Sequence, residues 1–420
     1  MQHVQKHFTF WLLLVLGQAL SAHAADAPPP LDPTKPPDVL AQTFVKTYGL
    51  DKLKNRKLAI TSFGVEFNQK VHVNARSSDY YYNNKTDFVL RGVDDAVFQR
   101  IADRAYKKLL EDLGQAGYQV LPAEALQAST AYQALLKDAG AKQKTPTEYK
   151  LKKRFDSERD VSASVIAPTG LQYYEPELDE DEGRGPAGDT AQGVLGSLAK
   201  NIGNKAGRKV RMHEVEVAKE LGATVMKVRY VVGFGDASAS VVANTTYKTD
   251  YIAEKVVKQL EVNRANSVRS RLSVLGRGET YFAFRTEDAN PNRKERTTVH
   301  FGGSGLLASA LKGTDSEVLD GNASLWLMES VDSGESFLSA DTQAAVAAAP
   351  EKKESGALSL FKGLGSALTG ATASKGTVTA SETSSFVANA DPDLFEYLAS
   401  AYLDVSRAML MSKLTAKSPQ

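Results

Sequence analysis

Cysteine is absent from this chain of 420 residues. Its absence excludes disulfide bonds, thiolate catalysis, iron–sulfur clusters and zinc sites built from cysteine ligands. It also excludes a lipid anchor attached to an N-terminal cysteine. The folded state must therefore be held by packing and hydrogen bonds instead of covalent cross-links.

Histidine is scarce as well, with six residues in the chain. Three of them lie within the first 24 residues, so the remainder keeps only His72, His213 and His300. No two of these are close enough in sequence to form a short-spacing metal or catalytic motif. The chain also lacks a phosphate-binding loop of the G-x-x-x-x-G-K-[ST] type and a G-x-S-x-G nucleophile elbow. We therefore predict no catalytic residue, no metal site and no cofactor.

Long apolar runs are missing except near the N-terminus, where residues 8–16 read FTFWLLLVL. Lys6 precedes this run, and Ala22-His23-Ala24 follows it as a small-x-small cleavage site. A basic N-terminal region, a short apolar segment and a cleavage site of small residues are typical of a secretory signal peptide. We predict that residues 1–24 are removed between Ala24 and Ala25 and that the mature protein is periplasmic. An outer-membrane-associated or a secreted protein stays open as an alternative.

An excess of either charge is also absent. The chain has 51 basic and 50 acidic residues, and loss of residues 1–24 removes one lysine, which leaves 50 of each. A net charge of zero argues against a general nucleic-acid binder and against strong attraction to anionic lipid.

Three tracts are poor in large apolar residues and are expected to be loops or insertions. They are a Pro-rich leader, a polar stretch that ends in the acidic run Glu175–Glu182, and an Ala/Ser/Thr/Gly-rich stretch. The predicted organisation is a signal peptide at 1–24, the leader at 25–50, the first part of an α/β domain at 51–137, the acidic insertion at 138–208, the second part at 209–340, the second insertion at 341–385 and a C-terminal helix at 386–420.

The segments between these tracts have clear periodicity. Residues 57–67 are β-rich and apolar, residues 93–113 repeat apolar side chains at helical spacing, and residues 118–121 form a short strand. A strand, a helix and a strand in this order indicate an α/β layer. Further along, we predict a short helix at 213–221, a strand at 224–232 that turns at Gly233-Phe234-Gly235, and a helix at 392–414. The fold class is therefore α/β, with a mixed β-sheet and flanking helices interrupted by long insertions.

The order of four fragments resembles the curli-secretion-channel family and its TolB N-terminal-like relatives. The fragments are LAITSF at 58–63, GYQVL at 117–121, AKELGATVMKV at 218–228 and LWLMESVDSGE at 325–335. The resemblance implies a mixed sheet packed against helices, and only this fold is carried over. The family's lipoprotein members carry a lipidated cysteine, which this chain lacks, so no channel-lining residue is carried over.

One segment is predicted to dock on a partner or on a membrane surface. In residues 356–370, apolar side chains recur at three- and four-residue spacing and form one face of a short helix. The alternative is a flexible loop whose leucines cover the core. The candidate docking residues are Leu358, Leu360, Phe361, Leu364 and Leu368.

Two tyrosine clusters, Tyr80–Tyr82 and Tyr173-Tyr174, suggest either a stacking surface for a ligand or, more simply, loop tips.

These observations favour an exported, non-catalytic protein that binds envelope or secretion proteins, with itself as a further candidate partner in a homo-oligomer. No nucleic-acid partner is expected, and a peripheral membrane contact is a further candidate. The two alternatives are an oligomeric outer-membrane pore or pore accessory, and an exported hydrolase that uses an unrecognised histidine or carboxylate pair.

Overall fold

The computed structural model describes most of the chain after residue 31. The described residues are 32, 34–77, 81–153, 157–174, 194–250, 255–276, 279–291, 322–332, 334–339, 371–374 and 381–416. The helices and strands are α2 (Pro37–Phe44), β1 (Val45–Tyr48), the 3-10 helix η1 (Leu50–Lys52), β2 (Lys57–Arg76), β3 (Asn83–Arg91), α3 (Asp95–Gln115), β4 (Gln119–Val120), α4 (Ala123–Gln127), α5 (Thr130–Ala139), β5 (Lys144–Lys153), β6 (Ser157–Ile166), α6 (Val194–Leu221), β7 (Thr224–Asp250), β8 (Lys255–Val274), β9 (Tyr281–Arg285), β10 (Asn322–Leu327), β11 (Ala371–Ser374), β12 (Ser381–Asn389) and α10 (Pro392–Ala416).

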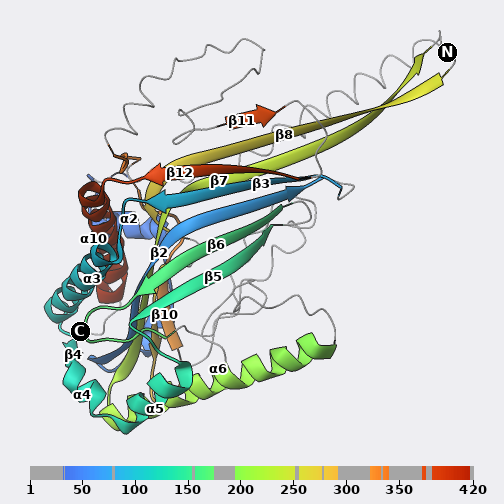
Figure 1. Cartoon of the computed structure of the whole chain (residues 1–420). Coiled ribbons are helices and arrows are strands. Elements are labelled where there is room, and N and C mark those ends of the chain that lie inside the picture. Colours follow the sequence, from blue (N-terminus) through green and yellow to red (C-terminus); the bar gives the residue numbers. More distant parts are fainter. Residues whose placement is uncertain are drawn as a thin grey trace, which may run out of the picture.

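A mixed sheet of twelve strands forms the centre of the molecule (Figure 1). β2 is its central strand, since it pairs in parallel with β7 along its first half and antiparallel with β3 along its second half. Its other edge pairs with β4 and then with β6. Beyond β7, the sheet continues through β9 and β10 to β1. The predicted α/β class with a mixed sheet and flanking helices is confirmed.

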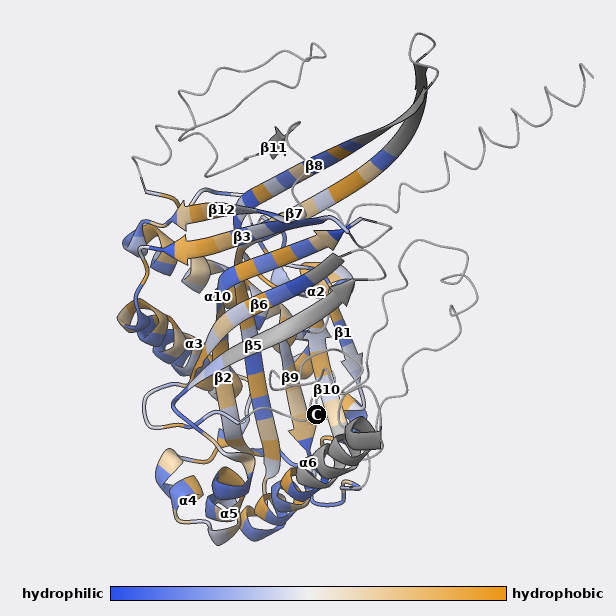
Figure 2. Cartoon of the chain, turned by 45° about the vertical axis from the view of Figure 1, so that its right-hand side comes forward, coloured by the Kyte–Doolittle hydropathy of each residue, from blue (hydrophilic) through white to orange (hydrophobic). Residues whose placement is uncertain are grey.

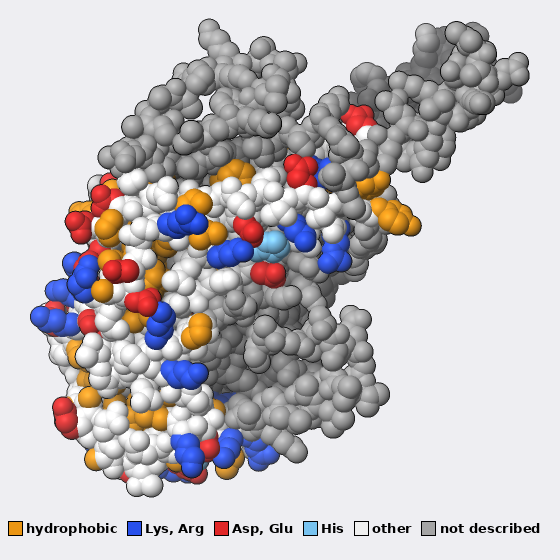
Figure 3. All heavy atoms as spheres, viewed as in Figure 1, with side chains coloured by type: hydrophobic (Ala, Val, Ile, Leu, Met, Phe, Trp, Pro, Cys, Tyr) orange, Lys and Arg blue, Asp and Glu red, His pale blue; other side chains and the backbone are white. Residues whose placement is uncertain are grey.

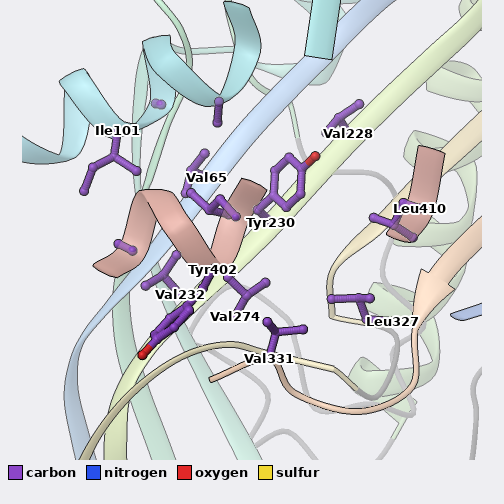
Figure 4. Packing of buried hydrophobic residues seen from close by; sticks show 14 of the residues in the cluster. Val65, Ile101, Val228, Tyr230, Val232, Val274, Leu327, Val331, Tyr402 and Leu410 are labelled. Atoms are coloured by element: carbon purple, nitrogen blue, oxygen red, sulfur yellow. The ribbon is translucent and has the colours of Figure 1, made fainter. Parts of the chain in front are cut away.

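Helices cover both faces of the sheet. On one face, α2, α3 and α10 pack over the main core, where Ile101 of α3 and Tyr402 and Leu410 of α10 meet side chains of β2 and β7 (Figure 4). On the other face, α4, α5 and the end of α6 enclose a smaller core around Tyr132 and Val225. A strand that is buried on both sides reads as a continuous apolar run, which explains the composition of residues 57–67.

A one-residue register shift in β2 decides which side chains reach which face. The pairing of β2 with β7 shifts between Ile60 and Ser62. Leu58 and Ile60 before the shift and Phe63 after it belong to the same core, so the alternation of the strand changes phase there.

The predicted helices α3 and α10 are confirmed, and each begins at an aspartate that caps its first turn. The Asp94 carboxylate accepts a hydrogen bond from the Val97 amide at 3.0 Å. The Asp391 carboxylate accepts one from the Leu394 amide, also at 3.0 Å. Caps of this kind satisfy amides that have no partner within the helix.

Several predictions for the insertions and turns were wrong. The expected turn at Gly233–Gly235 is a register shift within β7, which runs on to Asp250. The expected short helix at 213–221 is the end of the 28-residue α6. The expected loops at 138–208 contain β5, β6 and the first half of α6, the leader contains α2 and β1, and the second insertion contains β11 and the start of β12. For β1, β6, β11 and β12 a strand distant in the sequence supplies the pairing, which local composition cannot reveal.

In the part of the chain that the structure describes, no helix has the length and apolar character needed to cross a membrane. The charged side chains visible on the described surface are of both signs and are interspersed (Figure 3).

Candidate functional site: a projecting hairpin

The feature that extends furthest from the body is the hairpin of β7 and β8 (Figures 1 and 2). β7 pairs with β2 as far as Val232 and then continues with β8 as its partner up to Asp250. The 15 residues from 236 to 250 span about 50 Å in an extended strand. The hairpin therefore reaches well beyond the helices that cover the sheet.

Gly235 marks the place where the hairpin leaves the sheet. Its φ angle is +159°, and a Cβ atom built on it would lie 2.3 Å from the backbone oxygen of Arg269. The rings of Phe88 and Phe234 pack beside it with centroids 4.8 Å apart. A residue without a side chain is needed here because the backbones of β7 and β8 approach too closely for any other.

A buried polar network holds the base of the hairpin over β3 and β12. We call Asn84, Thr86, Asn266 and Ser384 the anchoring network. The Asn266 side-chain oxygen accepts hydrogen bonds from Asn84 at 2.7 Å and from Thr86 at 2.8 Å, and its nitrogen donates to Ser384 at 2.8 Å. Asn84 also donates to the backbone oxygen of Ser240 in β7 at 2.9 Å. Because buried amides and hydroxyls are costly to leave unbonded, this network favours one placement of the hairpin over the layer beneath.

Apolar packing reinforces the same contact. Ala75, Val241 and Val262 form a small buried cluster, and Tyr82 packs against it. Val241 and Val262 belong to the inner face of the hairpin, where every second residue is covered. The hairpin base is thus fixed by both polar and apolar contacts.

The described outer face of the hairpin carries polar, charged and small side chains, and Val242 is its one large apolar residue. Side chains alternate between covered and exposed along both strands, a pattern that also appears in their hydropathy (Figure 2). Val242 is 54% exposed and stands among polar and small residues. The exposed positions are Asp236, Ser238, Ser240, Val242 and Asn244 on β7 and Glu261, Asn263, Ala265, Ser267 and Arg269 on β8.

The hairpin also presents strand edges. Along residues 236–250, the only described strand that pairs with β7 is β8. The outer edge of β8 pairs with β11 over four residues, Arg264 to Ser267, and with no other described strand. Backbone groups on a strand edge can accept a further strand, from the same chain or from another one. The pairing of β11 is an example within this chain.

A second arrangement of functional groups is the buried charge cluster under α6. The Glu214 carboxylate of α6 contacts Lys227 of β7 at 2.9 Å and Arg285 of β9 at 2.6 Å, and all three side chains are at most 3% exposed. The Tyr174 hydroxyl donates to the same carboxylate at 3.0 Å. Burial alone would raise the pKa of Glu214, but the two cations outweigh it and lower the pKa to about 2. Glu214 is therefore an ionised anchor that fastens α6 to the sheet, and it is poorly suited to act as a general base near neutral pH.

Glu66 and Arg229 form a further buried ion pair next to this cluster. Both side chains are at most 1% exposed. Burial alone would lower the pKa of Arg229, but the charge of Glu66, supported by further anionic and phenolic groups, outweighs it and raises the pKa, which keeps Arg229 charged. Two buried ion pairs on the same face of the sheet favour a structural role for these charges.

The two histidines that the structure describes are each held by carboxylates. His72 contacts Asp87 at 2.6 Å. His213 contacts Asp138 at 2.7 Å with one ring nitrogen and Glu216 at 2.8 Å with the other. With both nitrogens of His213 engaged, it could accept a proton from a substrate or nucleophile only after one of these contacts breaks. His300 lies outside the described residues.

The tyrosine clusters do not form one surface in the part of the chain that the structure describes. Tyr173 and Tyr174 are buried, whereas Tyr81 is 76% exposed and Tyr82 packs under the hairpin. The idea of a common stacking surface was therefore wrong for these residues. The described residues also contain no group of three or more side chains that could hold a metal ion.

The candidate docking residues of the 356–370 segment lie outside the described residues. They are Leu358, Leu360, Phe361, Leu364 and Leu368.

The hairpin was not predicted from the sequence, because Gly233 and Gly235 suggested that the strand ends there. The signal that could have revealed it is the alternation of polar and small apolar residues from 236 to 241, which continues the strand beyond the glycines.

Comparison of the chain with protein families, curated proteins and solved structures gave no significant match.

Proposed function

We propose that this chain is an exported, non-catalytic periplasmic protein that binds other proteins in envelope assembly, secretion or the building of surface structures, and that the β7–β8 hairpin is its binding element. The observation that carries the proposal is the hairpin itself. Its strand β7 continues for about 50 Å past Gly235, the first part of this length packs over β3, and there the anchoring network holds it. An enzyme gains little from such an extension, whereas a protein that pairs with a strand of a partner needs exposed and well-oriented edges.

The finer fold assignment belongs to the same proposal. We infer that the sheet is of the type found in the curli-secretion-channel family and its TolB N-terminal-like relatives. Support comes from the parallel pairing of β2 with both β4 and β7, which places three of the four resembling fragments side by side.

Site-specific photo-crosslinking tests the binding role of the hairpin. A crosslinking amino acid at Val242, on the outer face of the hairpin, should give adducts with another envelope protein or with a second copy of the chain. The control position is Tyr397 on α10, which is 67% exposed and lies on the other side of the sheet. Equal adducts at both positions, or none at Val242, would contradict the proposal.

An oligomeric outer-membrane pore or pore accessory is the second candidate. Two hairpins, β5–β6 and β7–β8, extend toward the same side of the molecule with β2 and β3 between them, which favours contacts between copies along that side (Figure 1). The mass of the detergent-extracted protein by size exclusion separates the candidates, since a pore requires a large homo-oligomer and a monomeric binding protein does not.

An exported hydrolase is the third hypothesis. An activity screen with His72→Ala, His213→Ala and His300→Ala tests it. An activity that one of these variants abolishes would favour the hydrolase over the binding protein.

A further inference from the structure

The outer edge of β8 already holds one short strand. β11 lies beside it and pairs in the antiparallel direction, with Ala371 opposite Ser267 and Ser374 opposite Arg264 (Figure 1). Among the described residues, the other pairing on this edge is a single bridge between Val274 and Val331. The edge is therefore able to bind a further strand, and it does so at residues 264–267.

Side chains of β8 hold this part of the edge in place. Asn266 belongs to the anchoring network, which binds β3 and β12. The Arg264 guanidinium contacts the Glu382 carboxylate at 3.6 Å and donates to the backbone oxygen of Asn83 at 3.4 Å. Both Asn266 and Arg264 are 4% exposed. A strand that pairs here meets an edge whose conformation is already fixed, so β8 loses little conformational freedom on binding.

β11 is a weak occupant of this edge. A strand of four residues forms about four hydrogen bonds with an antiparallel neighbour, whereas β12 pairs with β3 over nine residues. Each hydrogen bond contributes little net free energy, because water replaces it when the strand leaves. Among the described strands, β11 pairs with β8 alone. A longer strand of similar chemistry can therefore replace β11.

The residues along this edge are small. β11 consists of alanine, threonine, alanine and serine. On β8, Ala265 and Ser267 are exposed, and the Ser267 hydroxyl lies 2.6 Å from the hydroxyl of Ser238 on β7. In strand addition, main-chain hydrogen bonds give affinity and the neighbouring side chains give specificity. The sequence of β11 thus indicates which kind of segment the edge accepts.

We propose that the β8 edge at residues 264–267 binds an extended, antiparallel segment of a partner protein that is rich in alanine, serine and threonine, and that β11 is an internal occupant which this segment replaces. The inference rests on the binding function proposed for the hairpin, and it adds the kind of segment that the hairpin recognises. Because β11 must leave first, the apparent affinity for the partner falls with the fraction of molecules whose edge is free.

Disulfide trapping tests the pairing, since the chain has no cysteine of its own. The purified full-length mature protein carries Ser267→Cys. The probe is a synthetic peptide of residues 369–377 with the substitution Ala371→Cys, at the register partner of Ser267. In a glutathione buffer, the fraction of mixed disulfide reports how often the peptide pairs with β8. Tyr397→Cys, at an exposed position of α10, gives the level of trapping without pairing.

Release of β11 should increase the trapping at Ser267→Cys. Successive amides of a strand point to opposite edges, so Thr372→Pro/Ala373→Pro removes one hydrogen bond to β8. The matched control Thr372→Ala/Ala373→Ser keeps both amides. The proline variant should trap at least about threefold more peptide than this control, because its edge is free more often.

A covalent lock should have the opposite effect. In oxidised Ser267→Cys/Ala371→Cys, a disulfide holds β11 on β8. A crosslinking amino acid at Val242, which lies opposite Asn263 of β8, should then give at least about tenfold fewer partner adducts than the same protein after reduction.

Three results would overturn the inference. They are equal trapping by the proline variant and its control, equal trapping at Ser267→Cys and Tyr397→Cys, and Val242 adducts that do not change when the lock is reduced. Failure of the proposed function looks different. The wild type would then give no adducts at Val242 while the proline variant still traps the peptide, which would support the strand-binding edge and contradict an envelope partner.

Discussion

Glu214 illustrates how a single buried charge depends on partners distant in the chain. Its carboxylate is fully buried between Lys227 and Arg285, the second of which is 71 positions away in the sequence. If one member of a buried charge cluster is removed, the remaining charges lose their partner in an environment that solvates them poorly. The free energy of unfolding should therefore be very sensitive to this residue.

We expect Glu214→Gln to lower the free energy of unfolding by about 3 kcal/mol or more, because Lys227 and Arg285 lose their counter-charge. Glu216→Gln, two residues away, removes an exposed carboxylate that contacts His213. This control should change the free energy of unfolding by less than about 0.5 kcal/mol. Urea unfolding measures both values, and similar losses for the two variants would show that the buried cluster contributes little.

The same residue predicts a pH dependence of stability. The pKa of Glu214 is lowered from 4.5 to about 2 in the folded protein. Its contribution is therefore complete above about pH 5 and is lost as the pH falls toward 2, by up to about 3 kcal/mol. The hydrogen bonds from Lys209 and His213 lower the pKa of Asp138 as well, so this exposed carboxylate loses its own contribution over the same acid range.

Comparison with Glu214→Gln isolates the contribution of this carboxylate. The variant should show a flatter decline in its free energy of unfolding between pH 5 and pH 2 than the wild type. Parallel curves for the two proteins would mean that Glu214 titrates normally.

At the scale of elements, the hairpin depends on a contact between layers that are remote in sequence. Asn266 of β8 binds Asn84 of β3 and Ser384 of β12 at once. Two of its partners, Asn84 and Thr86, are fully buried, so water cannot easily replace the hydrogen bonds that they would lose if Asn266 were removed.

We expect Asn266→Ala to lower the free energy of unfolding by about 1–3 kcal/mol, because the buried Asn84 and Thr86 each lose one of their acceptors. Amide hydrogens at the base of the hairpin should exchange faster in this variant. Asn263→Ala is the matched control, since Asn263 is exposed on the same strand. Unchanged exchange in Asn266→Ala would mean that the anchoring network does not hold the hairpin.

Elements with strong local signals were predicted well. α3 has a repeating apolar face and a capping aspartate within its own segment, and α10 has both as well. Both signals act within a few residues, so they can be read from the sequence. The predicted strand at 224–232 ended too early, because glycine usually ends a strand. In the structure, Gly235 lies within β7 and allows the backbone of β8 to approach. That approach exists only in the folded chain.

The candidate site was predicted less well than the fold. The sequence pointed to residues 356–370, whereas the candidate site in the described structure is the β7–β8 hairpin. The anchoring network of the hairpin joins β3, β8 and β12, so it depends on contacts that only the folded sheet provides.

At the scale of the whole molecule, we expect the mature protein to begin at Ala25. The small residues Ala22 and Ala24 before this position fit the cleavage site of an exported protein. Intact-mass measurement of the protein from the cell envelope tests this expectation. A chain that still begins at Met1 would contradict both the cleavage and the proposed location.

The sequence by itself determined the α/β class, the positions of α3 and α10 and the absence of covalent cross-links. These follow from periodicity, capping and composition, which act over one or two turns of chain. The tertiary structure alone decided that β7 continues past its glycines, that Glu214 meets Lys227 and Arg285, and that Asn266 joins three strands. Each of these depends on side chains or strands that are far apart in the sequence, and their energies exist only once the sheet has brought them together.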